Sequence, residues 1–206
     1  MNCYTREAVE KAVLKKGYKY FTNGAYNVNI IGIRNSSTNN QVTDKFDDCI
    51  MLSYKNDDSQ WITKCYKATT DPGKYWTENL MNSSGVAILK PGQYRGAYKI
   101  RKHRRKYYAL CQRGSVKVYR DRNKDNVYDL NEEKVQEGVY GINIHKAGSW
   151  DKGSKVVDKW SAGCQVFSKE SDFNEFMSVM YIARDRWSDS FSYTLINSND
   201  IYNDIN

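Results

Sequence analysis

The chain has 206 residues, of which 40% are hydrophobic and 27% charged, and only two are prolines. This length supports one substantial hydrophobic core and is short for two ordinary domains, and the aromatic-rich composition excludes a disordered or collagen-like polymer. The formal net charge of +8 predicts an anionic partner, such as nucleic acid, an acidic membrane surface or a cell-wall polymer. From the length and composition we expect a single domain over residues 1–206.

The predicted elements begin with a helix over residues 5–16, where small apolar residues recur at helical spacing. Short runs rich in β-branched and aromatic residues follow and predict strands. An apolar stripe from Phe173 to Tyr181 predicts a core-facing helix, capped by Ser168 or Ser171. This order predicts a β-rich α+β fold with one helix near each end. The predicted strands cover residues 26–33, 48–54, 60–66, 85–89, 107–112, 115–119, 139–145 and 192–196.

The sequence contains no signal for export or for membrane insertion. No apolar run approaches the roughly 20 residues that a membrane-spanning helix needs, and residues 1–17 lack the apolar segment of a secretory signal. We therefore expect synthesis in the cytoplasm, with no signal peptide and no membrane span. Five widely spaced cysteines predict reduced thiols, and with only two histidines a structural zinc site is not expected.

The densest basic segment covers residues 99–106, between two predicted strands. It predicts a cationic patch, which either serves binding or forms a solvated turn and a protected strand edge. His103 lies among these cations, which disfavour a protonated imidazole. We expect His103 at the surface or in contact with an anionic substrate, rather than as a base.

Cys164 is the candidate nucleophile among the five cysteines. Three small residues precede it and let the backbone and a substrate approach closely. In contrast, Cys49, Cys65 and Cys111 lie in apolar strand-like runs, where a cysteine usually acts as a small buried hydrophobe. His145 ends a strand-like run just before a turn, and an imidazole beside a thiol can take its proton and hold a thiolate–imidazolium pair.

His145, followed sixteen positions later by Ser161-Ala-Gly-Cys164, resembles the signature of the L,D-transpeptidase catalytic domain family. In that family the histidine is the base, the cysteine is the nucleophile, and a backbone carbonyl just after the histidine orients the ring. The resemblance implies that Cys164 is acylated, that His145 activates it and that the Lys146 carbonyl holds the imidazole. It also counts Ser161 among the catalytic residues and implies that backbone N–H groups around Gly163 stabilise the oxyanion.

The resemblance covers residues 139–167, the predicted catalytic segment, and departs from the family pattern at two positions. Ala162 stands where the family usually has a second histidine, and Val166 stands where an arginine or asparagine normally follows the cysteine by two. These departures bear on the substrate contacts and on the choice between transpeptidation and hydrolysis. The side chains expected to contact the substrate are His103, Trp160 and Gln165.

The resemblance implies a mixed β-sheet or β-sandwich and an enzyme that cleaves or cross-links peptidoglycan stem peptides without a required cofactor. Because such a substrate lies outside the cytoplasm, we expect a bacteriophage lysin or a virion-associated enzyme with virion proteins as partners. The alternative is a non-catalytic virion or wall-binding protein that keeps the fold. The third hypothesis, a nucleic-acid-binding protein, is supported by charge and tyrosine content alone, so nucleic acid is not the expected partner.

Residues 121–132 carry oxygen-bearing groups at the spacing of an EF-hand calcium loop. Asn126 replaces the expected glycine, and the flanking sequence predicts a strand rather than a helix. The segment is therefore either an acidic, asparagine-rich turn or a Ca²⁺ site. In the second case the ligands are Asp121, Asn123, Asp125, the Val127 carbonyl, Asp129 and Glu132.

Overall fold

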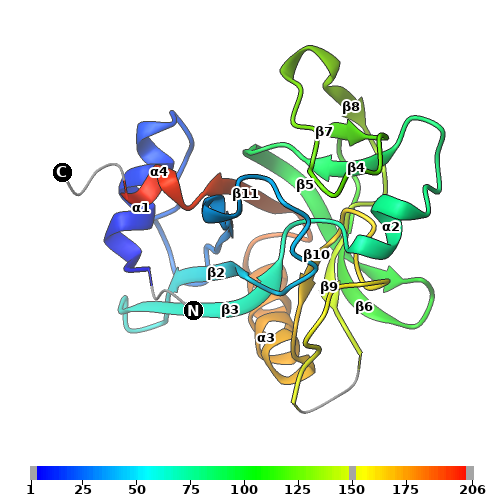
Figure 1. The fold of residues 1–206 in the computed structure, drawn as a ribbon. Coiled ribbons are helices and arrows are strands. Elements are labelled where there is room, and N and C mark those ends of the chain that lie inside the picture. Colours follow the sequence, from blue (N-terminus) through cyan, green and yellow to red (C-terminus); the bar gives the residue numbers. More distant parts are fainter. Residues whose placement is uncertain (1–3, 149–151, 203–206) are drawn as a thin grey trace.

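The computed structural model describes residues 4–148 and 152–202. Eight strands form a closed sheet in the order β1-β11-β5-β6-β9-β10-β3-β2, and three others form a small sheet in the order β4-β7-β8 (Figure 1). The predicted β-rich α+β class is confirmed. The strands are β1 (Asn29–Arg34), β2 (Asp48–Lys55), β3 (Trp61–Thr69), β4 (Val86–Leu89), β5 (Gly92–His103), β6 (Tyr107–Gln112), β7 (Val116–Asp121), β8 (Gln136–Gly138), β9 (Ile144–Lys146), β10 (Gln165–Phe167) and β11 (Phe191–Asn197).

Both predicted long helices are present. Helix α1 (Arg6–Lys15) begins after Thr5, whose hydroxyl accepts a hydrogen bond from the Ala8 N–H at 3.2 Å, as an N-cap does. Helix α3 (Glu170–Arg186) begins after Lys169 and has no side-chain cap, so neither Ser168 nor Ser171 is its N-cap. The shorter helices are α2 (Lys74–Glu78) and α4 (Asn199–Tyr202), with 3₁₀ turns at Ser36–Thr38 and Glu132–Lys134.

The closed sheet is covered on both faces around β1. Ile30 of β1 lies in the main core with the apolar stripe of α3, whereas Ile31 and Ile33 point outward and pack with Val9 and Val13 of α1. Full burial of each side chain of this size stabilises the folded state by about 1.5–3 kcal/mol. This two-sided covering explains why β1 is buried along its whole length and does not alternate between buried and exposed residues.

The basic segment belongs to a strand and a hairpin turn. Strand β5 is paired with both β11 and β6, so it is not an edge strand. Its aromatic and aliphatic residues, such as Tyr98 and Ile100, are buried. Arg101, the residue after Ile100, points to the opposite face of the strand and is exposed. Arg104 and Arg105 form the turn, with φ of 47° and 61°. The sequence pattern missed this strand because cationic residues interrupt its apolar residues.

The predicted strand over residues 139–145 is shorter than expected, and only its end forms β9. In residues 139–143, before β9, hydrogen bonds to the Gln112 side chain replace pairing with a strand. Gln112 Oε1 accepts from the N–H groups of Tyr140 and Ile142 at 3.1 and 2.9 Å. Gly141 lies between them with φ of 74°, which ends extended pairing. Residues 139–143, at the start of the predicted catalytic segment, are therefore irregular and are held by the side chain of Gln112.

Candidate functional site

The strand register brings Cys164 and His145 to the same face of the sheet. Strands β9 and β10 are parallel, with Val166 opposite His145 and Gln165 opposite Ile144. Side chains alternate along a strand, so Cys164 and His145 share one face, while Ile144 lies on the other face in the main core. The candidate base His145 therefore lies in β9, and the candidate nucleophile Cys164 directly precedes β10, two positions before the partner of His145.

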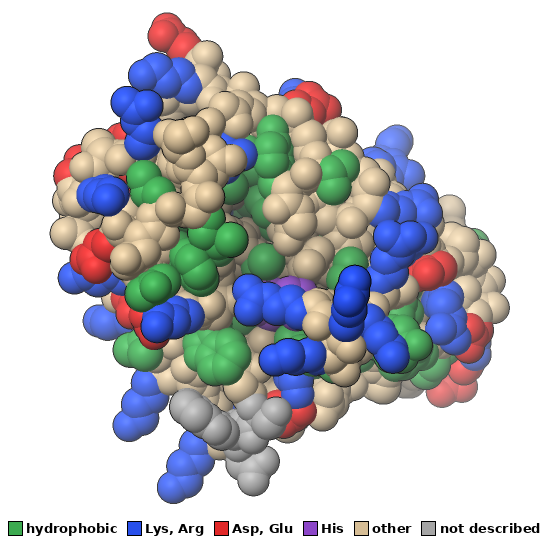
Figure 2. All heavy atoms as spheres, turned by 90° about the vertical axis from the view of Figure 1, so that its right-hand side faces the viewer, with side chains coloured by type: hydrophobic (Ala, Val, Ile, Leu, Met, Phe, Trp, Pro, Cys, Tyr) green, Lys and Arg blue, Asp and Glu red, His purple; other side chains and the backbone are tan. Residues whose placement is uncertain are grey.

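A cavity of about 400 Å³ opens on this face, beneath the small sheet. Cys164 and His103 both line it, together with aromatic and apolar side chains such as Trp76 and Tyr140. Two cations, Arg104 and Arg120, also line it. Figure 2 shows this side of the molecule, where a histidine surface is visible between Lys and Arg side chains next to hydrophobic ones. The cavity therefore combines a thiol, an imidazole and positive charge.

The two histidines form a stacked pair. Their ring centroids lie 4.2 Å apart at an interplanar angle of 21°. His145 Nδ1 is 2.8 Å from the Lys146 carbonyl, the group that the resemblance assigns to it, and the Tyr107 hydroxyl donates to the same carbonyl at 3.2 Å. Because a carbonyl only accepts, Nδ1 of the neutral ring carries the proton, and Nε2 keeps its lone pair. His145 is therefore in the tautomer that a general base requires.

Asn143 fixes the opposite tautomer in His103. The Asn143 side-chain oxygen accepts a hydrogen bond from the Gln112 N–H at 2.9 Å, so its amide nitrogen is the group 3.1 Å from His103 Nδ1. That nitrogen donates, so His103 Nδ1 must accept and Nε2 carries the proton. The neutral His103 ring is thus a hydrogen-bond donor at Nε2, not a base.

Burial keeps both rings neutral. Burial, together with the neighbouring His103 and Arg104, lowers the pKa of His145 to about 3, against the opposing effect of the hydrogen bond to Lys146. Burial and the charge of Arg104 lower the pKa of His103 to about 4. His103 is 7% exposed, so it lies at the cavity wall and not at the molecular surface. At neutral pH the pair is uncharged.

Cys164 is a protonated thiol at rest. Its sulfur lies 3.4 Å from the donating Asn143 N–H and 3.5 Å from the Gly141 carbonyl, to which the thiol donates. Burial raises the pKa of Cys164 to about 11, although the Asn143 N–H and the charge of Arg104 oppose this shift. Among the described residues no hydrogen bond joins the sulfur to His145. A standing thiolate–imidazolium pair is therefore not the resting state, and any proton transfer has to accompany attack.

Ser161 and Gly163 shape the turn before Cys164. The Ser161 hydroxyl donates to the Cys164 carbonyl at 2.8 Å and accepts from the Gly163 N–H at 3.1 Å, and Ser161 is fully buried. Gly163 has φ of 118°, and a Cβ there would lie 2.3 Å from the Ala87 carbonyl oxygen. The Gly163 N–H, predicted as an oxyanion donor, is thus already engaged. The Cys164 N–H has no hydrogen-bond partner within residues 4–148 and 152–202.

The other predicted substrate contacts lie away from the cavity. Gln165 is fully buried, its nitrogen donates to the carbonyls of Thr70 and Gly163, and its oxygen accepts from the Tyr193 hydroxyl at 2.7 Å. Gln165 therefore holds β10 in place. Trp160 is 37% exposed and does not line the cavity. Trp76 and Tyr140 could not be recognised as lining residues from the sequence, because their segments reach the cavity only through the tertiary fold.

The acidic loop is held by its own hydrogen bonds. Asp125 accepts from the Val127 N–H at 2.9 Å, and Asn123 accepts from the Asp125 N–H at 3.2 Å. Glu132 forms an ion pair with Lys90. Across the described ranges, no three or more His, Cys, Asp or Glu side chains gather in a way that could hold a metal ion. The Ca²⁺ site stays a prediction.

Comparison of the chain with protein-family models, with curated proteins and with solved structures finds no match. Within the part of the chain that the structure describes, no helix is both long enough and apolar enough to cross a membrane. The resemblance to L,D-transpeptidases therefore stays a prediction that rests on the motif from His145 to Cys164.

Proposed function

We propose that the protein is a cysteine-dependent acyl-transfer enzyme of the L,D-transpeptidase type, acting on peptidoglycan stem peptides as a phage lysin or virion-associated enzyme. The proposal depends on one observation: Cys164 lines a cationic cavity on the same sheet face as an imidazole whose Nδ1 proton is bound by the Lys146 carbonyl. That arrangement supplies a nucleophile, an oriented base and a place for an anionic substrate.

Substrate binding follows from the charge of the cavity. Arg104 is exposed and has no carboxylate partner in the described part of the chain, and it lines the cavity beside Cys164. A stem peptide ends in a carboxylate, which a guanidinium can bind through two parallel hydrogen bonds. Docking of the terminal carboxylate near Arg104 would bring the last peptide bond to the thiol.

In the chemical step, His145 Nε2 takes the proton of Cys164 while the sulfur attacks the carbonyl carbon of the penultimate residue. The resulting oxyanion accepts hydrogen bonds from the Cys164 N–H and from Nε2–H of His103, each worth roughly 3 kcal/mol. The depressed pKa of His145 favours quick return of this proton to the leaving amine as the C–N bond breaks. An amine or water then attacks the thioester, loses its proton to His145 and releases the sulfur.

Substitution of the two central residues tests the proposal. Cys164→Ala and His145→Ala should each lower muropeptide turnover by at least roughly 10³-fold, because a nucleophile and its base act as a unit. Cys111→Ala is the matched control, since that buried thiol lies on neighbouring β6 and hydrogen-bonds only to the Arg101 carbonyl. Mass spectrometry of purified muropeptides detects both a lost D-residue and a new cross-link. Full activity in either central variant would refute the assignment.

A second candidate is a non-catalytic virion or wall-binding protein with the same fold. The raised pKa of Cys164 and the missing sulfur–imidazole hydrogen bond within the described residues favour it. Iodoacetamide labelling separates the two functions: in an enzyme, a bound muropeptide should protect Cys164 selectively over the other thiols. Absence of protection together with absence of turnover would support the binding protein.

A further inference from the structure

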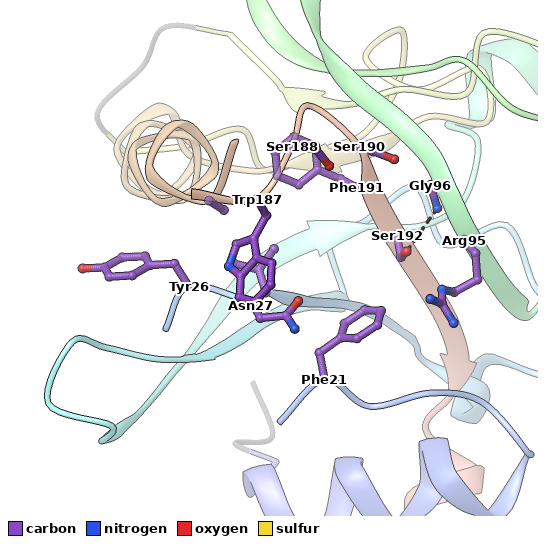
Figure 3. Close-up of a pocket in the computed structure, with 12 residues that line it drawn as sticks. Phe21, Tyr26, Asn27, Arg95, Gly96, Trp187, Ser188, Ser190, Phe191 and Ser192 are labelled. Carbon is purple, nitrogen blue, oxygen red and sulfur yellow. Dashed lines mark hydrogen bonds between the residues drawn. The ribbon is translucent and has the colours of Figure 1, made fainter. Parts of the chain in front are cut away.

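A second concave site lies at the end of α3, where β5 and β11 run side by side (Figure 3). This Trp187 groove has a volume of about 360 Å³. None of its lining residues lines the Cys164 cavity. The residues that the argument uses are Phe21, Arg95, Trp187, Ser190 and Ser192.

The indole of Trp187 is a fixed, open platform. Its Nε1–H donates to the Ala25 carbonyl at 3.0 Å, and the ring packs directly over Gly24, where an added Cβ would lie 2.5 Å from a ring carbon. Trp187 nevertheless remains 54% exposed. With its only donor already bound, the ring can offer a ligand its face and nothing polar. A large exposed aromatic side chain held this firmly loses little conformational entropy when a ligand stacks on it.

Phe21 and Arg95 form the opposite side of the groove. The backbone of Phe21 is clamped by the Asn29 side chain, which accepts from its N–H at 2.7 Å and donates to its carbonyl at 2.8 Å. The Arg95 guanidinium carbon lies 5.1 Å from the centroid of the Phe21 ring. In Figure 3 both side chains point into the space that the indole also borders. The groove therefore pairs aromatic surfaces with a cation.

Two serine hydroxyls of the groove can act as donors. Ser192 Oγ accepts from the Gly96 N–H at 3.1 Å, and Ser190 Oγ accepts from Arg113 at 3.1 Å. Neither hydroxyl proton has an acceptor in the described part of the chain, so both can donate outward. Together with the guanidinium of Arg95, they suit a ligand that is rich in acceptor oxygens and has one flat apolar face.

Among the described residues that line the groove, Arg95 is the one cation. Arg113 donates to the Gly96 carbonyl and to Ser190, and Arg186 is paired with Asp57 through both carboxylate oxygens. Arg95 has no carboxylate partner within the described ranges. A single-stranded nucleic acid requires a track of free cations along its backbone. The charge count instead fits a ligand with a single anionic group.

We propose that the Trp187 groove binds a saccharide that carries one carboxylate. The apolar face of a sugar ring stacks on Trp187, the carboxylate pairs with Arg95, and ring or carbonyl oxygens accept from Ser190 and Ser192. The volume lies at the small end of the range of ligand sites, which suits one or two sugar rings. Choosing a wall sugar as the probe rests on the proposed function, but the groove itself shares no residue with the Cys164 cavity.

Calorimetric titration of the Cys164→Ala protein with the disaccharide N-acetylglucosaminyl-N-acetylmuramic acid tests the site without turnover. We expect saturable binding that Trp187→Ala weakens about tenfold or more. Arg95→Ala should remove the preference for this acid over neutral di-N-acetylchitobiose, and it should leave the fold intact because Arg95 is exposed. Trp160→Ala is the matched control, an exposed tryptophan outside the groove, and should bind as the parent does.

The groove and the catalytic proposal can fail separately. Three results would each overturn the saccharide site. They are the absence of saturable binding, binding by the Arg95 and Trp187 variants as tight as that of the parent, and preferential binding of an oligothymidylate. In the Cys164-containing protein, Trp187→Ala should keep its turnover of small soluble muropeptides, since Trp187 does not line the catalytic cavity. Loss of binding with persistent turnover would remove the saccharide site alone. Persistent binding together with full turnover in Cys164→Ala would remove the catalytic assignment alone.

Discussion

Lowering the pH from 8 to 5 tests whether His103 and His145 are both buried as neutral rings. Their pKa values, about 4 and about 3, lie below the usual value near 6.5 of an exposed histidine. The unfolded chain therefore binds more protons than the folded one, and stability falls as the pH drops below 6.5 toward the folded pKa values. At pH 5 the cost is about 2 kcal/mol for each ring, from about 1.36 kcal/mol per pH unit over about 1.5 units.

Buried carboxyl groups act in the opposite direction, so a difference measurement is needed. Burial raises the pKa of Asp48 to about 7 and that of Asp121 to about 6, and these groups favour the folded state as the pH falls. Urea unfolding of wild type and His145→Gln at both pH values cancels these common contributions. The stability advantage of wild type should shrink by about 2 kcal/mol at pH 5. Parallel pH profiles, or an NMR titration with either ring near pH 6.5, would refute the burial of neutral rings.

Three further predictions concern the turns and the thiol of the site. The alkylation rate of Cys164 should keep rising from pH 8 to pH 10, because its pKa is raised to about 11; a rate already constant at neutral pH would indicate a resting thiolate. Gly163→Ala should destabilise by more than about 3 kcal/mol in urea unfolding, whereas Gly141→Ala, with open space around its Cβ, should cost only about 1–2 kcal/mol, and equal losses would contradict the steric argument. Arg105→Gly should raise the unfolding free energy by about 1 kcal/mol, because it relieves a positive φ in the hairpin turn; a loss of stability would show that the side chain itself contributes.

The helices and most strands could be predicted because each follows a local period. Helix α1 and the stripe from Phe173 to Tyr181 show their buried faces directly in the spacing of apolar residues. Strand β5 also alternates around Tyr98 and Ile100, which are buried, but the adjacent Lys99 and Arg101 made the segment resemble a cationic surface patch. Strand β10 has only three residues, which is too short for a period to be recognised.

The site could be predicted only in part. The motif indicated Cys164 and His145, because small residues before a thiol and a histidine at a strand end are local features. The stacking of His103 on His145 arises from the register of β5 with β6 and of β6 with β9, and these contacts join residues far apart in the chain. The same distance hid the role of Gln112, whose side chain replaces a stretch of strand pairing.

The position of β11 in the closed sheet bears on how the chain acquires its structure during synthesis. β11 is the last strand of the described part of the chain, yet it lies between β1, with which it is parallel, and β5. Until residues 191–197 leave the ribosome, β1 and β5 each present an unpaired edge, and such edges invite association between nascent chains. Because of this topology, we expect folding of the chain to depend on chaperones and to be sensitive to truncation before residue 191. This expectation is independent of the function of the Cys164 cavity.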